Sequence, residues 1–132
     1  MHLEEAIKLL RQYSCMTVKI PQSEAEKKEL QQAVIKVVNL SDWENLGICA
    51  NNSEVGFAVL TSYLKALGYP ARFDLSAINA SKEPVYIKYN TQKLSYHLDY
   101  YNGASRGVLI SCQSENDLIA GTYGYFPENL FD

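Results

Sequence analysis

The chain has 132 residues, of which 47% are hydrophobic and 20% are charged, and its net charge is −3. This length is near the commonest domain size, so we expect one domain over residues 1–132 with one hydrophobic core. The 12 Lys and Arg residues are scattered, so we expect no nucleic-acid partner. The apolar runs are far shorter than the roughly 20 residues that cross a bilayer, so we expect no membrane partner.

The first residues and the cysteines predict a cytoplasmic protein. The N-terminal stretch carries acids and apolar residues at helical spacing, unlike the basic-then-apolar order of a signal peptide. The three cysteines, Cys15, Cys49 and Cys112, form no CxxC pair, so we expect reduced thiols. With only His2 and His97 as histidines, we expect no metal site, and no cofactor-binding motif is found.

The first half of the chain predicts three helices. Apolar residues at helical spacing predict the first over residues 2–14. The second is expected after Ser23, an N-cap with Glu26 three residues on, as in a capping box. The third is expected to begin within residues 51–53 and to end at Gly68.

The second half predicts mainly β-sheet, because the apolar period changes from 3.6 to 2 after residue 72. The expected strands are Trp43–Cys49, Phe73–Ile78, Val85–Tyr89, Leu94–Tyr101 and Arg106–Cys112. Gly121, Gly124 and Pro127 are expected to break any longer element near the C-terminus. The expected fold class is α+β, with helices of the N-terminal half packed on one face of a mainly antiparallel sheet formed by the C-terminal half.

Alternating polar and apolar residues predict a first antiparallel hairpin. A turn at residues 90–93 would place Tyr89 opposite Leu94. The apolar face would then hold Val85, Ile87 and Tyr89 with Leu94, Tyr96, Leu98 and Tyr100. We therefore expect that face to lie on the core and the opposite face to lie in solvent.

A second hairpin is predicted at Asn102-Gly103, since both residues tolerate the positive φ of a type I′ turn. With this turn, Asp99 would lie opposite Arg106 and His97 opposite Val108. The sequence therefore predicts an ion pair beside a histidine.

The polar face of these hairpins is the best candidate for binding, and it would gather Tyr86, Lys88, His97, Asp99 and Arg106. One interpretation is an ordinary solvent face, where cross-strand charge pairs contribute at most about 1 kcal/mol. Another is a site for a small ligand or a protein partner. Proton-transfer catalysis would need a tuned pKa in a cleft, and the sequence indicates neither.

A hypothesis of cysteine catalysis rests on a thiol that precedes the third helix. Cys49, followed later by Ala66-Leu67-Gly68-Tyr69-Pro70-Ala71-Arg72, looks somewhat like the Cys-bearing segment of transglutaminase-like enzymes. His97 would act as base, with Asp99 or a later acid, Glu115 or Asp117, as its partner. The alternative interpretation is purely structural: Gly68 and Pro70 end a helix and carry no function.

The chain holds ten tyrosines and ends in an aromatic tail. We expect the apolar side chains of this tail to pack against the fold and not to be disordered. They are Tyr123, Tyr125, Phe126, Leu130 and Phe131. Together with the helices and the sheet they exceed what a domain of this size can hide, so we expect a homo-oligomer with aromatic residues of the sheet or the tail in its interface.

Four segments carry a resemblance over the full length of the chain: Trp43-Glu44-Asn45-Leu46-Gly47, Gly68-Tyr69-Pro70-Ala71-Arg72, Arg106-Gly107-Val108-Leu109-Ile110-Ser111 and Gly124-Tyr125-Phe126-Pro127-Glu128. With them the chain resembles a largely cyanobacterial family known as domain of unknown function 1824. The resemblance implies an intracellular protein of a photosynthetic lineage and transfers no catalytic residue. The leading hypothesis is thus a non-enzymatic interaction or assembly module, followed by small-ligand binding and by cysteine catalysis.

Overall fold

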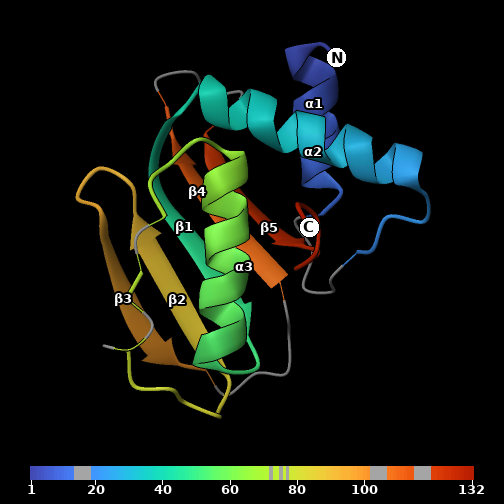
Figure 1. The fold of residues 1–132 in the computed structure, drawn as a ribbon. Helices are drawn as coiled ribbons and strands as arrows, with labels where there is room; N and C mark the ends of the chain where they lie inside the picture. Colours follow the sequence, from blue (N-terminus) through green and yellow to red (C-terminus); the bar gives the residue numbers. More distant parts are fainter. Residues whose placement is uncertain (14–18, 72, 75, 77, 102–106, 115–119) are drawn as a thin grey trace.

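The computed structural model describes residues 1–13, 19–71, 73, 74, 76, 78–101, 107–114 and 120–132 (Figure 1). These residues form three helices and one five-stranded sheet. The elements are α1 (Leu3–Arg11), α2 (Glu24–Asn39), β1 (Asp42–Ala50), α3 (Ser53–Ala66), β2 (Val85–Asn90), β3 (Ser95–Tyr100), β4 (Gly107–Gln113) and β5 (Gly121–Phe126). The expected α+β class is confirmed.

The helices begin and end where local sequence signals place them. The Ser23 hydroxyl accepts a hydrogen bond from the Glu26 amide at 3.1 Å, which caps α2. Asn52 caps α3 in the same way. At the other end of α3, Gly68 adopts a φ of 81°, and its amide and that of Tyr69 donate to the last carbonyls of the helix. This is the Schellman arrangement that glycine permits.

The sheet is antiparallel throughout, with strand order β3-β2-β1-β4-β5. The predicted pairing of the strands of the second hairpin is therefore wrong, because β2 and β1 lie between β3 and β4. Val108 lies opposite Ile48, not opposite His97. The predicted turn at residues 102 and 103 and the predicted partner Arg106 lie outside the described residues. A local turn signal cannot report that β1, which precedes α3 in the chain, takes the centre of the sheet.

The first hairpin keeps its predicted faces but shifts in register. Tyr89 lies opposite Tyr96 rather than Leu94, so the turn occupies residues 91–94. The Asn90 side-chain oxygen accepts hydrogen bonds from the amides of Gln92 and Lys93, both at 3.0 Å, which stabilises the later turn. Because the pairing moves by two positions, every side chain stays on its predicted face.

Two other predictions of secondary structure are wrong. The described residues of the predicted strand Phe73–Ile78 belong to no strand, since the Asp74 carboxylate accepts hydrogen bonds from the amide and hydroxyl of Ser76 and closes a turn. Conversely, Gly121 and Gly124 lie inside β5, where they were expected to break structure. Gly124 lies where the pairing of β4 with β5 shifts, and glycine in a strand is typical of such a bulge.

All three helices lie on one face of the sheet, and no described helix or strand covers the other, which we call the open face (Figure 1). α3 packs across β1 and β2, while α1 and α2 pack on each other and α1 reaches β5. The core between these layers contains the inward side chains of the three central strands, such as Leu46, Ile87 and Ile110. β3 is one edge of the sheet, and among the described helices only α3 comes near it, where the Phe57 ring meets the Tyr96 ring edge-on with centroids 5.1 Å apart.

Candidate functional site

Four of the five predicted binding residues lie together on the open face of the sheet. Tyr86 lies opposite Asp99, and Lys88 lies opposite His97 on the neighbouring strand. Arg106, the fifth, lies outside the described residues. The structure thus places this polar group on β2 and β3 as the alternation predicts.

The polar group is held by weak forces. One ring nitrogen of His97 lies 3.0 Å from the Asp99 carboxylate, two residues along the same strand. Their side chains are 71% and 61% exposed, so solvent screens the contact. Three cavities in the described part of the chain are lined by other residues. This arrangement suits a charged surface better than a reaction centre.

The Tyr86 ring lies flat on the open face, above the backbone of Gly47 in the central strand. A methyl group added at Gly47 would overlap the Tyr86 phenol, so only glycine leaves room for the ring. Cys49 lies opposite Tyr86 on the same face and is buried. Burial, then the neighbouring Cys49, Tyr125 and Asp99, raise the pKa of Tyr86.

We expect Gly47→Ala to push the Tyr86 ring off the sheet and uncover Cys49. The test uses a Cys15→Ser background, in which Cys49 and Cys112 are the remaining thiols and Cys112 is buried. A thiol reagent at pH 8 should modify Cys49 much faster in the Gly47→Ala variant than in the Cys15→Ser parent protein. Tyr86→Ala, which uncovers the same thiol without a clash, gives the reference rate. Parent-like slow labelling of Gly47→Ala would show that the ring has not moved.

The structure does not bring together the residues of the cysteine-catalysis hypothesis. Cys49 lies on β1 and His97 on β3, with β2 between them, so two strand spacings of roughly 4.8 Å each separate their backbones. Burial raises the pKa of the Cys49 thiol, which disfavours the nucleophilic thiolate. Asp99 contacts His97 but lies on the same exposed strand, and Glu115 and Asp117 lie outside the described residues.

The predicted interface residues of the tail lie mostly inside the chain's own fold. Tyr123, Phe126 and Leu130 are buried, whereas Tyr125 and Phe131 are half-buried. The Tyr63 hydroxyl of α3 donates a hydrogen bond to the Pro127 carbonyl, which ties the tail to the helix layer. In this arrangement the three buried side chains offer no surface to a partner.

The most exposed apolar side chains of the sheet belong to the β3 edge. Tyr100 is 69% exposed, Tyr96 43% and Leu94, at the end of the preceding turn, 59%. The Tyr101 amide donates to Pro84 at 2.9 Å, so odd-numbered residues of β3 direct their backbone groups toward β2. Tyr96, Leu98 and Tyr100 therefore direct their N–H and C=O groups outward from the sheet.

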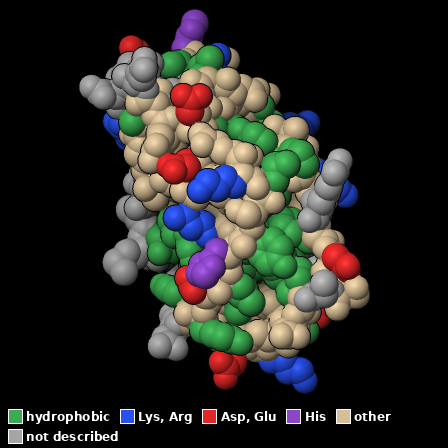
Figure 2. All heavy atoms as spheres, turned by 90° about the vertical axis from the view of Figure 1, so that its left-hand side faces the viewer, with side chains coloured by type: hydrophobic (Ala, Val, Ile, Leu, Met, Phe, Trp, Pro, Cys, Tyr) green, Lys and Arg blue, Asp and Glu red, His purple; other side chains and the backbone are tan. Residues whose placement is uncertain are grey.

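An aromatic groove runs beside this edge on the helix-facing side. It has a volume of about 440 Å³ and is lined by Pro70, Phe73, Tyr89, Leu94, Ser95 and Tyr96. The Phe73 ring meets those of Tyr89 and Tyr96 edge-on, with centroids 5.9 and 5.6 Å apart. Figure 2 shows hydrophobic side chains gathered on this side of the molecule, next to a group of charged side chains.

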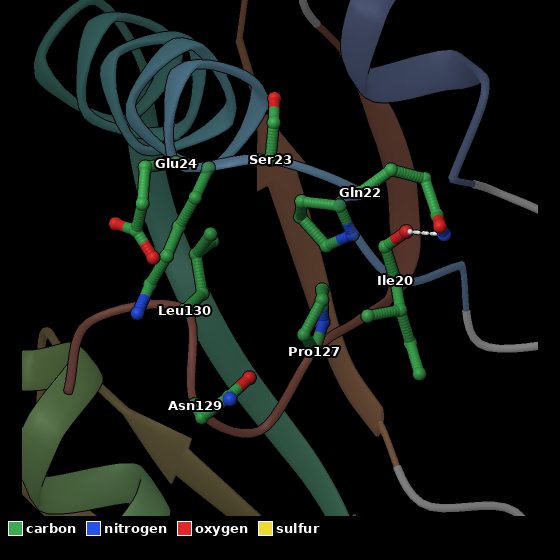
Figure 3. Close-up of a pocket in the computed structure, with 9 residues that line it drawn as sticks. Ile20, Gln22, Ser23, Glu24, Pro127, Asn129 and Leu130 are labelled. Carbon is green, nitrogen blue, oxygen red and sulfur yellow. Dashed lines mark hydrogen bonds between the residues drawn. The ribbon is translucent and has the colours of Figure 1, made fainter.

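A second cavity, of about 410 Å³, lies between the start of α2 and the C-terminal tail (Figure 3). Glu24 and Lys27 bring opposite charges to its wall, and the Gln22 side-chain Nε2 donates to the Ile20 carbonyl at 3.0 Å. A third cavity is lined by Asp42, Gln92, Gln113 and Ser114. The second cavity mixes apolar, polar and charged residues, and the third is lined by one carboxylate and three neutral polar residues.

The described part of the chain contains no cluster of three or more His, Cys, Asp or Glu side chains arranged to hold a metal ion. None of its helices has the length and apolar character needed to span a membrane.

Sequence reasoning did not identify the β3 edge as the main exposed apolar surface. The alternation correctly assigned Tyr96 and Tyr100 to the helix-facing side of the sheet, and core positions were expected there. The missing information was the strand order, which places β3 at the edge of the sheet, beyond β1 and β2 on which α3 mainly packs. The number of expected strands was the available signal, since one helix about 10 Å wide covers only about two strands that lie roughly 4.8 Å apart.

Comparison with known proteins gives a family without assigned chemistry. The family model described as Domain of unknown function (DUF1824) matches residues 8–131. A crystal structure of an uncharacterized protein from Anabaena variabilis has 35% sequence identity and a TM-score of 0.86, and the match covers 100% of both chains. No curated protein matches the chain.

Proposed function

Because the chain belongs to the DUF1824 family, a family of unknown function, we propose from its structure that it is a non-enzymatic assembly module that associates with itself through the β3 edge. The observation that carries the proposal is the run of outward backbone groups at Tyr96, Leu98 and Tyr100, beside exposed aromatic rings. An edge of this kind pairs with another strand by main-chain hydrogen bonds.

β3 carries one of the features with which natural proteins keep edge strands apart, the charged side chain of Asp99, but not the strongest of them. Residues 95–100 contain no Pro or Lys, and their pairing with β2 has no bulge. The opposite edge differs, because the pairing of β4 with β5 shifts between Val108 and Ile110 and Tyr125 adopts a φ of 58°. Such a bulge twists an edge away from a partner. β3 is thus the edge suited to association.

The proposal predicts a dimer that a single outward proline disrupts. Wild-type protein at micromolar concentration should scatter light with about twice the mass of 14.9 kDa. Leu98→Pro should give a monomer, because proline removes an outward N–H and adds a ring at the strand-pairing surface without breaking the bonds to β2.

The matched control is Leu98→Ala, which removes much of the same side chain but keeps the amide, and which should remain dimeric. Circular dichroism checks that each variant is folded, and Tyr100→Pro, at the next outward amide, replaces Leu98→Pro if that variant unfolds. A folded proline variant that keeps the dimer mass, or a monomeric wild type at these concentrations, would contradict the proposal.

A further inference from the structure

Resting on the proposed function, we propose a specific pairing of the two copies: β3 strands antiparallel about a two-fold axis, with Leu98 opposite Leu98 of the partner subunit. In this register Tyr96 lies opposite the partner's Tyr100. The side chain of the partner's Tyr100 then enters the aromatic groove beside Phe73 and Tyr96. The groove is completed by a residue that only a second copy supplies.

The backbone selects this register. The three outward residues, Tyr96, Leu98 and Tyr100, are centred on Leu98. A two-fold axis at Leu98 lets all three exchange both of their hydrogen bonds, which makes about six across the interface. A shift of the pairing by two residues leaves one of the three outward residues without a β3 residue opposite it. In one direction, for example, Tyr100 would lie opposite the partner's Leu94, which is in the turn and has a φ of 50° instead of an extended backbone.

The charges select the same register. With Leu98 on the axis, His97 lies opposite Asp99 of the partner subunit, and the symmetric contact forms a second time. These residues form non-hydrogen-bonded pairs, in which side chains lie closest. A shift in one direction would place His97 against the partner's His97, and a shift in the other would place two Asp99 carboxylates together. Two carboxylates placed directly opposite each other are destabilising, and either shift loses the contact between His97 and the partner's Asp99.

The proposed pairing explains why Tyr100, the most exposed tyrosine, lies at the surface of a single copy: in the dimer its side chain enters the groove of the partner subunit. Tyr100 is on the helix-facing side of β3, because it lies opposite the buried Val85. A residue directly opposite in a neighbouring strand is about 5 Å away, so the partner's Tyr100 lies beside the Tyr96 ring at the groove wall. Aromatic rings placed in this way favour edge-on packing, as Phe73 and Tyr96 already show.

Cysteine cross-linking can report the register. His97→Cys and Asp99→Cys are made separately in a Cys15→Ser background, since Cys49 and Cys112 are buried. In the proposed register a mixture of the two variants should form a disulfide, because the opposed Cα atoms lie about 4.5 Å apart. Neither variant alone should form one, because its two cysteines would be offset by two residues and lie roughly 8 Å apart.

Each other outcome overturns the inference in an identifiable way. Cross-linking of the His97→Cys variant alone or of the Asp99→Cys variant alone indicates a shifted register and leaves the proposed function standing. A dimer by light scattering with no cross-link in any sample places the interface elsewhere and contradicts the proposed function as well. Monomers in every sample contradict both.

The anchoring role of Tyr100 has its own test. We expect Tyr100→Ala to raise the dimer dissociation constant about 30-fold in sedimentation equilibrium, the effect typical of an aromatic hot spot. Tyr100→Phe should retain the affinity, because the ring rather than the hydroxyl fills the groove. Ile20→Ala, which removes another exposed side chain, is the control and should change nothing. A dissociation constant for Tyr100→Ala equal to that of the control would overturn the anchoring role.

Discussion

Phe126→Ala is expected to lower the free energy of unfolding by about 3–5 kcal/mol. Phe126 is fully buried at the end of β5, opposite Val108, and its ring centroid lies 5.8 Å from that of Tyr13. Its removal leaves a cavity between the sheet and the chain that follows α1. Urea unfolding of both proteins at one protein concentration measures the loss.

This prediction also separates a core role of the tail from an interface role. Tyr125→Ala, which truncates the half-buried neighbour on the open face, is the control and should cost distinctly less. A Phe126→Ala protein that keeps its stability but changes its mass in solution would place Phe126 in an interface and not in the core.

Alkaline pH is expected to destabilise the protein partly through Tyr63. Burial, then the nearby Asp132 and Glu128, raise the pKa of Tyr63 well above its ordinary value of 10.0. Above pH 10 the phenol ionises in the unfolded chain while the folded state keeps its proton, so unfolding is favoured as the pH rises. The contribution of Tyr63 to stability is complete below pH 10 and declines above it by about 1.4 kcal/mol for each pH unit, until the folded pKa is reached.

Tyr63→Phe makes this linkage measurable. The variant should lose about 1 kcal/mol at pH 8, since the hydrogen bond to the Pro127 carbonyl is gone. The difference between wild type and variant should then narrow as the pH rises above 10. Leu60→Ala, a core truncation without an ionisable group, should keep a constant difference. A constant difference for Tyr63→Phe as well would show that its phenol does not carry the alkaline loss.

Helix termini were predictable because they depend on neighbours in the sequence. Ser23 and Asn52 cap their helices through amides three residues ahead, and Gly68 ends α3 through its own positive φ. The faces of the first hairpin were predictable for a similar reason, since alternation fixes them whatever the exact turn. Its register was not, because the Asn90 side chain favours a turn one residue later than expected.

The strand order was beyond such local signals. A strong turn motif at residues 102 and 103 predicted that β3 and β4 pair directly, yet β1 and β2 lie between them. β1 takes the centre because it is apolar on both faces, with Cys49 buried on one and Ile48 on the other. Long-range burial therefore decided the pairing of the strands.

The candidate site was predicted only in part, because some of its features follow from alternation along one strand and others depend on the strand order. Tyr86, Lys88, His97 and Asp99 share a face as expected, because that inference needed only alternation. The aromatic groove depends on Phe73, which comes from a segment predicted to be a strand but whose described residues belong to no strand. The importance of β3 as a free edge became visible only with the complete sheet.

Amide hydrogen exchange at single residues tests the central claim, association through the β3 edge, most directly. In a concentrated sample the amides of Tyr96, Leu98 and Tyr100 should be protected, and on dilution below the dimer dissociation constant they should exchange rapidly. The amides of His97 and Asp99, which point toward β2, should stay protected in both samples and serve as internal controls. Rapid exchange of the three outward amides in a sample that light scattering shows to be dimeric would contradict the account.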